Sequence, residues 1–186
     1  HMNKIMSQAK LIYDDLITIR RTIHSNPEVG AKLPKTKAYV IDKLKEFGYE
    51  PQEICESGVV ATISGKNPGK TFLLRADMDA LPVVEATECD FKSTNGSMHA
   101  CGHDMHTAML LGAAKLLREN QDDIEGTVKL VFQPDEEGFT GAKKMLAAGV
   151  LENPHVDAAM AMHVHSGTPS NMVLCGLGTR DRKSTR

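Results

Sequence analysis

Short apolar runs alternate along this chain with longer segments in which apolar residues recur every three or four positions. The short runs are typical of buried strands and lie at 58–63, 71–76, 127–132 and 157–162. The longer segments have the spacing of amphipathic helices and lie at 5–24, 34–47, 105–118 and 141–148. Strands that alternate with helices predict an α/β fold, with a largely parallel or mixed sheet covered on both faces.

Composition limits the kind of protein and its partners. With 186 residues, 41% of them apolar, the chain is long enough to bury a core, and one domain is expected. A net charge of −2 without any basic block argues against nucleic acid as a partner. We find no apolar run long enough to cross a bilayer and no secretory leader, so no membrane partner is expected. The four scattered cysteines favour a reducing, cytoplasmic location.

Acidic residues and histidines follow three of the predicted strands, at the point where each strand ends. Asp77 and Asp79 follow the second strand, Glu136 and Glu137 follow the third, and His163 follows the fourth. In open α/β sheets, ligands bind outside the carboxyl ends of the strands. We therefore expect these side chains to meet at one edge of the sheet.

A thiol and an imidazole stand two residues apart at the start of the third long helix. Thiolate and imidazole are preferred ligands of zinc, and a helix N-terminus should favour the ionised form of Cys101 beside His103. Asp104 is expected to cap the helix or to support a ligand. Met105 and Met109 are expected to face the core. Structural roles stay open for both candidates, because free cysteines and satisfied histidines are common in protein cores.

The gathered groups suit metal-assisted hydrolysis of an amide or an ester. Adjacent residues on an extended segment point to different sides, so one of Glu136 and Glu137 could bind a metal while the other accepts a proton. The candidate donors outnumber the ligands of one tetrahedral ion, which indicates two metals. The two glutamates could instead form a solvated acidic loop, and Asp79 could cap a turn.

Three motifs carry a resemblance to a known family. The stretches 74–82 (LRADMDALP), 98–104 (MHACGHD) and 134–138 (PDEEG) resemble the signatures of M20 metallopeptidases. The most similar branch comprises amidohydrolases that cleave N-acyl amino acids, such as hippurate hydrolases, aminoacylases and auxin-conjugate hydrolases. The resemblance runs from the first helix to Gly178, and it implies a three-layer α/β/α catalytic domain like that of zinc exopeptidases.

The resemblance also implies roles for individual residues. Its metal ligands match Cys101, His103, Glu137 and His163. Glu136 matches the general acid/base and Asp79 the supporting aspartate of the catalytic site, whereas Asp77 matches no ligand. The implied cofactors are two divalent ions, with zinc favoured by the thiolate and manganese, cobalt or nickel as alternatives. The implied substrate is a small N-acyl amino acid, and the full-length protein is expected to be a homodimer.

Family members continue into a lid and dimerisation domain and then supply a last histidine ligand, none of which this sequence matches. We therefore expect residues 3–179 to be the N-terminal part of the catalytic domain and residues 180–186 to be a non-native tail. Three alternatives remain open: a catalytically incompetent fragment, a metal-dependent dipeptidase or aminopeptidase of the same family, and a hydrolase with Cys101 as nucleophile.

Overall fold

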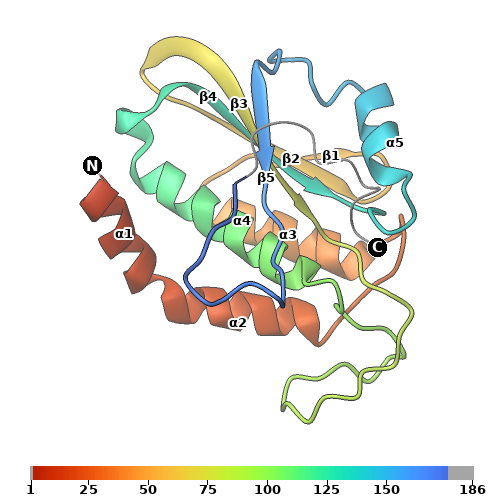
Figure 1. Cartoon of the computed structure of the whole chain (residues 1–186). Coiled ribbons are helices and arrows are strands. Elements are labelled where there is room, and N and C mark those ends of the chain that lie inside the picture. Colours follow the sequence, from red (N-terminus) through yellow and green to blue (C-terminus); the bar gives the residue numbers. More distant parts are fainter. Residues whose placement is uncertain (1, 176–186) are drawn as a thin grey trace.

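The computed structural model describes residues 2–175 (Figure 1). The end of the predicted domain, 176–179, and the predicted non-native tail, 180–186, lie outside the described residues.

A five-stranded mixed sheet forms the centre of the molecule, with the strand order β1-β2-β4-β3-β5. The antiparallel pairs are β1 with β2 and β2 with β4, whereas β3 runs parallel to both β4 and β5. Four strands match the predicted apolar runs, and β1 is an addition. The strands are β1 (Gln52–Ile54), β2 (Gly58–Ser64), β3 (Asn67–Asp77), β4 (Glu125–Gln133) and β5 (Ala158–Ala161).

The three parallel strands bring their carboxyl ends to one edge of the sheet. Asp77 at the end of β3 pairs with Gln133 at the end of β4, and Arg75 pairs with Ala161 at the end of β5. The chain segments that follow these strands therefore start side by side. This register confirms that the three polar strand exits share one edge.

Five α-helices and one 3₁₀ turn lie between or before the strands of the described chain. The predicted helix 5–24 is interrupted at Ile12, where α1, which buries no residue, gives way to α2, which buries Ile19 and Ile23. Pro34 opens α3 because its fixed φ suits the first turn and its missing N–H has no helical partner there. The helices are α1 (Met2–Leu11), α2 (Tyr13–His24), α3 (Pro34–Glu46), α4 (His103–Glu119), the 3₁₀ turn η1 (Gln121–Asp123) and α5 (Gly141–Ala147).

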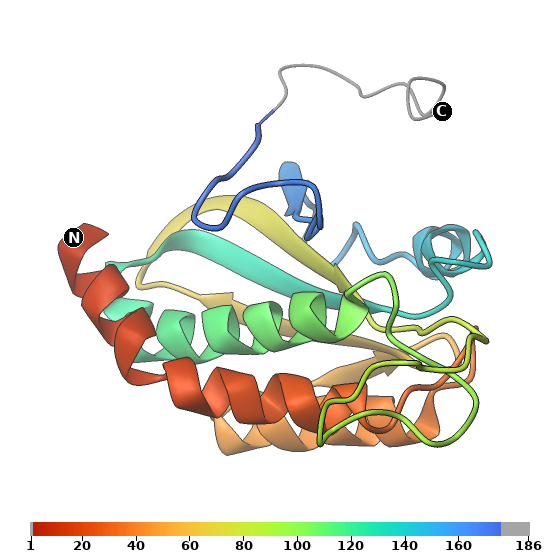
Figure 2. The same ribbon diagram turned by 60° about the horizontal axis from the view of Figure 1, so that its bottom comes forward.

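The helices cover both faces of the sheet, as the three-layer prediction requires. Figure 2 shows α2, α3 and α4 together on one side and α5 on the other. Leu130 and Phe132 of β4 point into the main core beneath α2 to α4. Their neighbour Val131 points to the opposite face, where it packs with Met145 of α5. The alternation follows from the two-residue period of a strand.

The buried surface of α4 differs from the prediction. Leu110 and Leu111 are buried, whereas Met109, predicted to face the core, is 37% exposed. The helix α4 packs against α2 as well as against the sheet, so its buried positions are not confined to the single face that was predicted. At Gly112 an added Cβ would lie 2.8 Å from a methyl carbon of Leu16, so α2 and α4 approach closely there.

Candidate metal centre

The candidate ligands meet around the first residue of α4. Ligand atoms of Cys101, His103 and His163 all lie within 4.8 Å of one another. The same holds for ligand atoms of His103, Glu136 and Glu137. These five residues come from the start of α4, the turn after β4 and the segment after β5. All four predicted metal ligands and the predicted acid/base are thus gathered at one edge of the sheet. These two groups share His103, which also lies in a third group, with Asp77 and His106.

The ring of His103 is fully buried and directed by one hydrogen bond. Its Nδ1–H donates to the carbonyl oxygen of Asp79 at 2.8 Å, which leaves Nε2 as the free ring atom. Among the described residues, Nε2 has no hydrogen-bond partner. It lies 3.9 Å from a carboxylate oxygen of Glu136 and 3.9 Å from one of Glu137. Metal-binding histidines typically donate their other ring N–H to a carbonyl or carboxylate in this way.

Opposing effects act on the pKa of His103. Burial lowers this pKa. The hydrogen bond to Asp79 and the negative charges of Asp77 and Asp79 raise it by a larger amount, so the net shift of the pKa is upward. The surroundings of this ring therefore favour a positive charge. A proton or a metal cation at Nε2 would satisfy that preference equally.

Asp79 links the segments that carry the candidate ligands. Its carbonyl oxygen accepts the His103 N–H, and its Oδ2 accepts the main-chain N–H of Glu137 at 3.0 Å. The alternative that Asp79 merely caps its own turn is wrong, because Glu137 lies 58 residues further along the chain. Its other oxygen, Oδ1, is buried without a hydrogen-bond partner in the described chain. Asp79 thus supports the position of the two neighbouring groups.

The two glutamates lie in a turn and not on an extended strand exit. Phe139 donates its N–H to the carbonyl of Glu136 at 2.9 Å, and Asp135 just before them has φ of 54°. The prediction that the two side chains point to opposite sides is therefore wrong, since each carboxylate reaches to 3.9 Å from His103. They are not a solvated loop either, because Oε1 of Glu137 is buried and unpaired among the described atoms.

Cys101 and His163 complete the group. The thiol of Cys101 lies 3.4 Å from Nε2 of His163, whose Nδ1–H faces the carbonyl oxygen of Val164. His163 is exposed, and it reaches the group from the segment after β5. Nε2 of His163 and the sulfur of Cys101 therefore both lie beside His103.

The prediction that the helix N-terminus would favour the thiolate is wrong for the metal-free chain. Burial raises the pKa of Cys101, and the negative charges of Glu137, Glu136 and Asp77 raise it further, to about 12. A thiol that stays protonated near neutral pH is a poor nucleophile, which disfavours the alternative with Cys101 as the attacking group. The same negative surroundings favour a divalent cation, whose binding would in turn favour the thiolate.

The chemistry of the donor set and its unpaired atoms fit a metal ion. Buried polar atoms without partners are rare in native proteins and call for an explanation. Of the seven such atoms among the described residues, two belong to candidate ligands, His103 and Glu137, and a third is Oδ1 of Asp79, the residue that holds both in place. Nitrogen, sulfur and carboxylate oxygen together are the ligand types of zinc and related ions.

Sequence reasoning placed Asp77 at this edge without counting it as a ligand and gave no role to His106, and the structure brings both into the same region. Both side chains are buried, and Nδ1 of His106 lies 2.6 Å from a carboxylate oxygen of Asp77. Burial raises the pKa of Asp77, but the hydrogen bond from His106 and the charge of Arg75 outweigh it and lower the pKa to about 2. The signal in the sequence is the spacing of three between His103 and His106, which puts both on one side of α4.

A second cluster of charged residues lies on another side of the α4 N-terminus. Asp104 does not cap the helix. It accepts hydrogen bonds from Arg20 at 2.7 Å and from Nδ1 of His24 at 2.8 Å. Nε2 of His24 bonds to Glu85 at 2.9 Å. Burial raises the pKa of Glu85, but hydrogen bonds from His24, from Thr87 and from a main-chain N–H outweigh it and bring the pKa to about 2.

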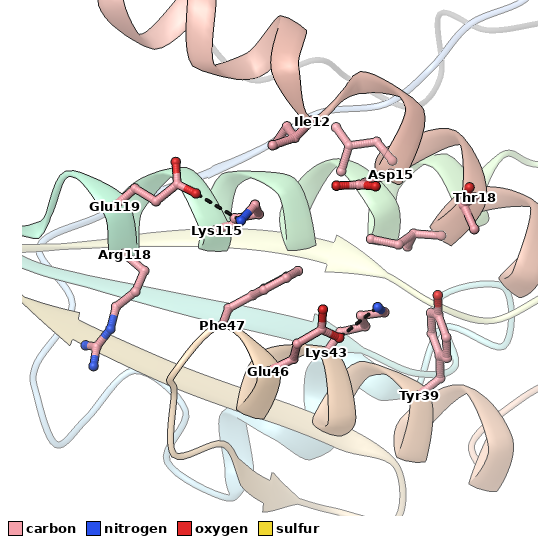
Figure 3. A pocket seen from close by; sticks show the side chains of 12 residues that line it. Ile12, Asp15, Thr18, Tyr39, Lys43, Glu46, Phe47, Lys115, Arg118 and Glu119 are labelled. Carbon is pink, nitrogen blue, oxygen red and sulfur yellow. Dashed lines mark hydrogen bonds and ion pairs between the residues drawn. The ribbon is translucent and has the colours of Figure 1, made fainter.

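A hollow of about 360 Å³ lies between α2, α3 and α4 (Figure 3). Four of its charged side chains form two ion pairs, Lys43 with Glu46 at 2.8 Å and Lys115 with Glu119 at 2.9 Å. Lys115 is twelve residues along α4 from His103, which corresponds to about 18 Å of helix. This hollow is therefore separate from the candidate metal centre, and its lining has neither histidine nor cysteine.

Comparison with known proteins decides the family. Residues 73–178 match the model of peptidase family M20/M25/M40, and this range includes every candidate ligand. The chain belongs to this peptidase family. Within residues 2–175, no helix of this M20 family member is long and apolar enough to cross a membrane.

Individual relatives agree with this assignment. The chain is 47% identical over 176 residues to thermostable carboxypeptidase 2 of Saccharolobus solfataricus, covering 92% of this chain and 44% of the relative. It is 43% identical over 155 residues to N-acyl-L-amino acid amidohydrolase of Geobacillus stearothermophilus, covering 82% and 41%. The chain thus spans less than half the length of these M20 relatives.

A solved structure shares the fold. The YXEP protein of Bacillus subtilis, described as a dinuclear metal binding peptidase from the M20 family, matches with a TM-score of 0.82 and 40% identity. The match covers 86% of this chain and 45% of the other. The described residues therefore correspond to one part of a larger M20 protein.

Proposed function

We propose that this chain is the N-terminal part of the catalytic domain of a metal-dependent amidohydrolase that cleaves N-acyl amino acids. Cys101, His103, Glu137 and His163 are its metal ligands. The observation that carries the proposal is the buried Nε2 of His103, which has no hydrogen-bond partner among the described residues and lies within 4 Å of three carboxylates, those of Asp77, Glu136 and Glu137. A group this costly to bury unpaired is explained by a cation that completes it.

We infer that the complete site holds two divalent ions. Support comes from the two overlapping ligand groups around His103 and from a relative described as dinuclear metal binding. The thiolate of Cys101 favours zinc over manganese, cobalt or nickel. When bound, such ions would polarise the substrate carbonyl and lower the pKa of a nearby water molecule.

Glu136 is the proposed general acid/base. Its side chain is about one-quarter exposed, at 26%, and its carboxylate lies 3.9 Å from His103, so it borders both the metal centre and solvent. In this role Glu136 accepts a proton from the attacking water and then returns it to the nitrogen of the leaving amine. Asp79 keeps Glu137 and His103 in place through its two hydrogen bonds.

The proposed substrate is a small N-acyl amino acid, which hydrolysis converts into a carboxylic acid and a free amino acid. A relative named N-acyl-L-amino acid amidohydrolase supports this substrate. A relative named carboxypeptidase supports a second candidate, the removal of a C-terminal amino acid from a peptide at the same site. Both activities belong to the whole protein, which we expect to be a homodimer. Four free cysteines in the described chain suit the reducing cytoplasm.

The test is hydrolysis of N-acetyl and N-benzoyl amino acids, compared with dipeptides, by the full-length protein and by this chain. We expect turnover by the full-length protein that chelators abolish and zinc or manganese restores. Turnover that resists chelators but stops on thiol alkylation would contradict the proposal and favour Cys101 as nucleophile. Substoichiometric metal and absent turnover in the 186-residue chain alone would identify it as an incompetent fragment.

A further inference from the structure

His163 lies beyond the part of the chain that the sheet holds in place. The pairing of β5 with β3 ends at Ala161, opposite Arg75. Within the described segment 163–175, two hydrogen bonds reach the rest of the chain. One joins the thiol of Cys101 to His163, and in the other the N–H of Val164 donates to Nε2 of His106 at 2.9 Å. The main chain beside His163 is therefore fastened by His106.

The ring of His106 can hold Val164 because it is itself held in one orientation. Since Nε2 accepts the Val164 N–H, the ring proton lies on Nδ1 and is donated to Asp77 at 2.6 Å. The other oxygen of Asp77 lies 2.9 Å from Nη1 of Arg75. His106 is buried, and both of its nitrogens are used in these contacts. It is therefore not free to act as a metal ligand.

The side chain of Val164 makes a second contact with the metal centre. Gly102, between Cys101 and His103, has φ of +85°, and a Cβ added there would lie 2.4 Å from a methyl carbon of Val164. The missing side chain of Gly102 thus leaves the space that Val164 fills. Val164 is joined to the α4 N-terminus through its main chain and its side chain together.

We propose that His106 is a positioning residue that fixes Val164, so that Nε2 of the neighbouring His163 faces Cys101 before any ion binds. Asp77 and Arg75 act through it by holding its ring. The inference rests on the proposed metal site, since it assigns a purpose to the position of one proposed ligand. Removing a residue that holds a metal ligand in place without touching the metal typically lowers metal affinity by about 10- to 100-fold.

The first test uses metal-free protein in the presence of a chelator. Hydrogen exchange at the Val164 amide is measured by NMR in the wild-type chain and in the His106→Phe and His106→Gln variants. The amide nitrogen and oxygen of glutamine can replace the two ring nitrogens, whereas phenylalanine keeps only the ring shape. We expect exchange about tenfold faster in His106→Phe, as for the loss of one hydrogen bond, and nearly wild-type exchange in His106→Gln. Equal exchange in the wild type and His106→Phe would overturn the inference.

The second test measures zinc affinity by competition with a chromophoric chelator. We expect binding about 10- to 100-fold weaker in His106→Phe and near wild-type binding in His106→Gln. Val164→Pro removes the same hydrogen bond without altering the buried ring, so it tests the inference even if His106→Phe fails to fold. His155→Phe, a matched change at an exposed histidine, should bind zinc normally.

The two tests separate failure of the inference from failure of the proposed function. Wild-type zinc affinity in both His106→Phe and Val164→Pro would overturn the positioning role. A full-length wild-type protein that binds no zinc, yet shows a Val164 amide whose protection depends on His106, would instead overturn the proposed metal site. That second result would still support the fixed position of His163.

Discussion

Two clusters of polar residues, each with histidine and glutamate, flank the N-terminus of α4, and they differ in how those histidines and glutamates are paired. The open cluster contains Cys101, His103, Glu136, Glu137 and His163. The closed cluster contains Arg20, His24, Glu85 and Asp104, joined to one another by hydrogen bonds of 2.7 to 2.9 Å.

Proximity alone would make both clusters candidate metal sites. His24, Glu85 and Cys89 offer ligand atoms within 4.8 Å of one another, as do the members of the open cluster. In the closed cluster, both nitrogens of His24 and both oxygens of Glu85 have partners, and one atom, Oδ1 of Asp104, is buried without a hydrogen-bond partner among the described residues. In the open cluster, His103 and Glu137 keep buried atoms that have none among the described residues. The difference therefore lies in the candidate ligand atoms themselves: those of His24 and Glu85 are paired, whereas those of His103 and Glu137 are unpaired and available to a ligand.

The largest expected effect concerns catalysis in the open cluster. Glu136→Gln in the full-length protein should lower kcat by about 10²- to 10⁴-fold, because a positioned proton acceptor contributes that much. The metal content should stay at the wild-type value, since Glu136 is not a proposed ligand. Steady-state kinetics and metal analysis of the same preparation measure both quantities. An active Glu136→Gln enzyme would remove the assigned role.

The next effect concerns stability in the closed cluster. His24→Phe would leave the carboxylates of Glu85 and Asp104 buried without their shared partner. A hydrogen bond to a charged group typically contributes about 1.5 to 3 kcal/mol, so we expect the loss of two of them to lower the free energy of unfolding by about 3 to 6 kcal/mol. Urea denaturation of the metal-free chain measures it, with the exposed His155→Phe as the matched control. A change as small as that of the control would show that the closed cluster does not stabilise the fold.

A smaller effect is expected from pH at His99, which is buried next to both clusters. Burial lowers its pKa from 6.5 to about 4, so between these values the unfolded chain binds a proton that the folded chain does not. Stability should therefore fall as pH decreases from 6.5 to 4, by about 3 kcal/mol at most. Denaturation of the metal-free wild type and of His99→Leu across this range measures the contribution. Parallel curves for the two proteins would contradict it.

The position of the open cluster could be predicted from the sequence because it depends on local patterns. Apolar runs define β3, β4 and β5, and the carboxyl ends of parallel strands must share an edge. The conformation of Glu136 and Glu137 could not be predicted, because nothing in the apolar pattern shows that the chain turns directly after β4.

The closed cluster could not be predicted for a different reason. Asp104 and His24 are 80 residues apart in the sequence, and His24 and Glu85 are 61 apart. No local spacing reports a contact between such distant segments, which tertiary packing alone brings together. The same holds for the contact between His106 and Val164, 58 residues apart. The interruption at Ile12 was missed because apolar residues keep their helical spacing across it.

The most direct measurement compares one substitution made in each cluster. Zinc and cobalt binding are measured by equilibrium dialysis for the wild-type chain, Glu137→Gln and Glu85→Gln, with circular dichroism to verify folding. Thiolate-to-cobalt charge-transfer absorption reports whether Cys101 is a ligand. We predict that Glu137→Gln loses most of the bound metal, whereas Glu85→Gln is less stable but keeps the wild-type stoichiometry and absorption. The assignment of the open cluster as the metal centre would be contradicted if Glu137→Gln bound as much metal as the wild type. It would also be contradicted if only Glu85→Gln lost its bound metal.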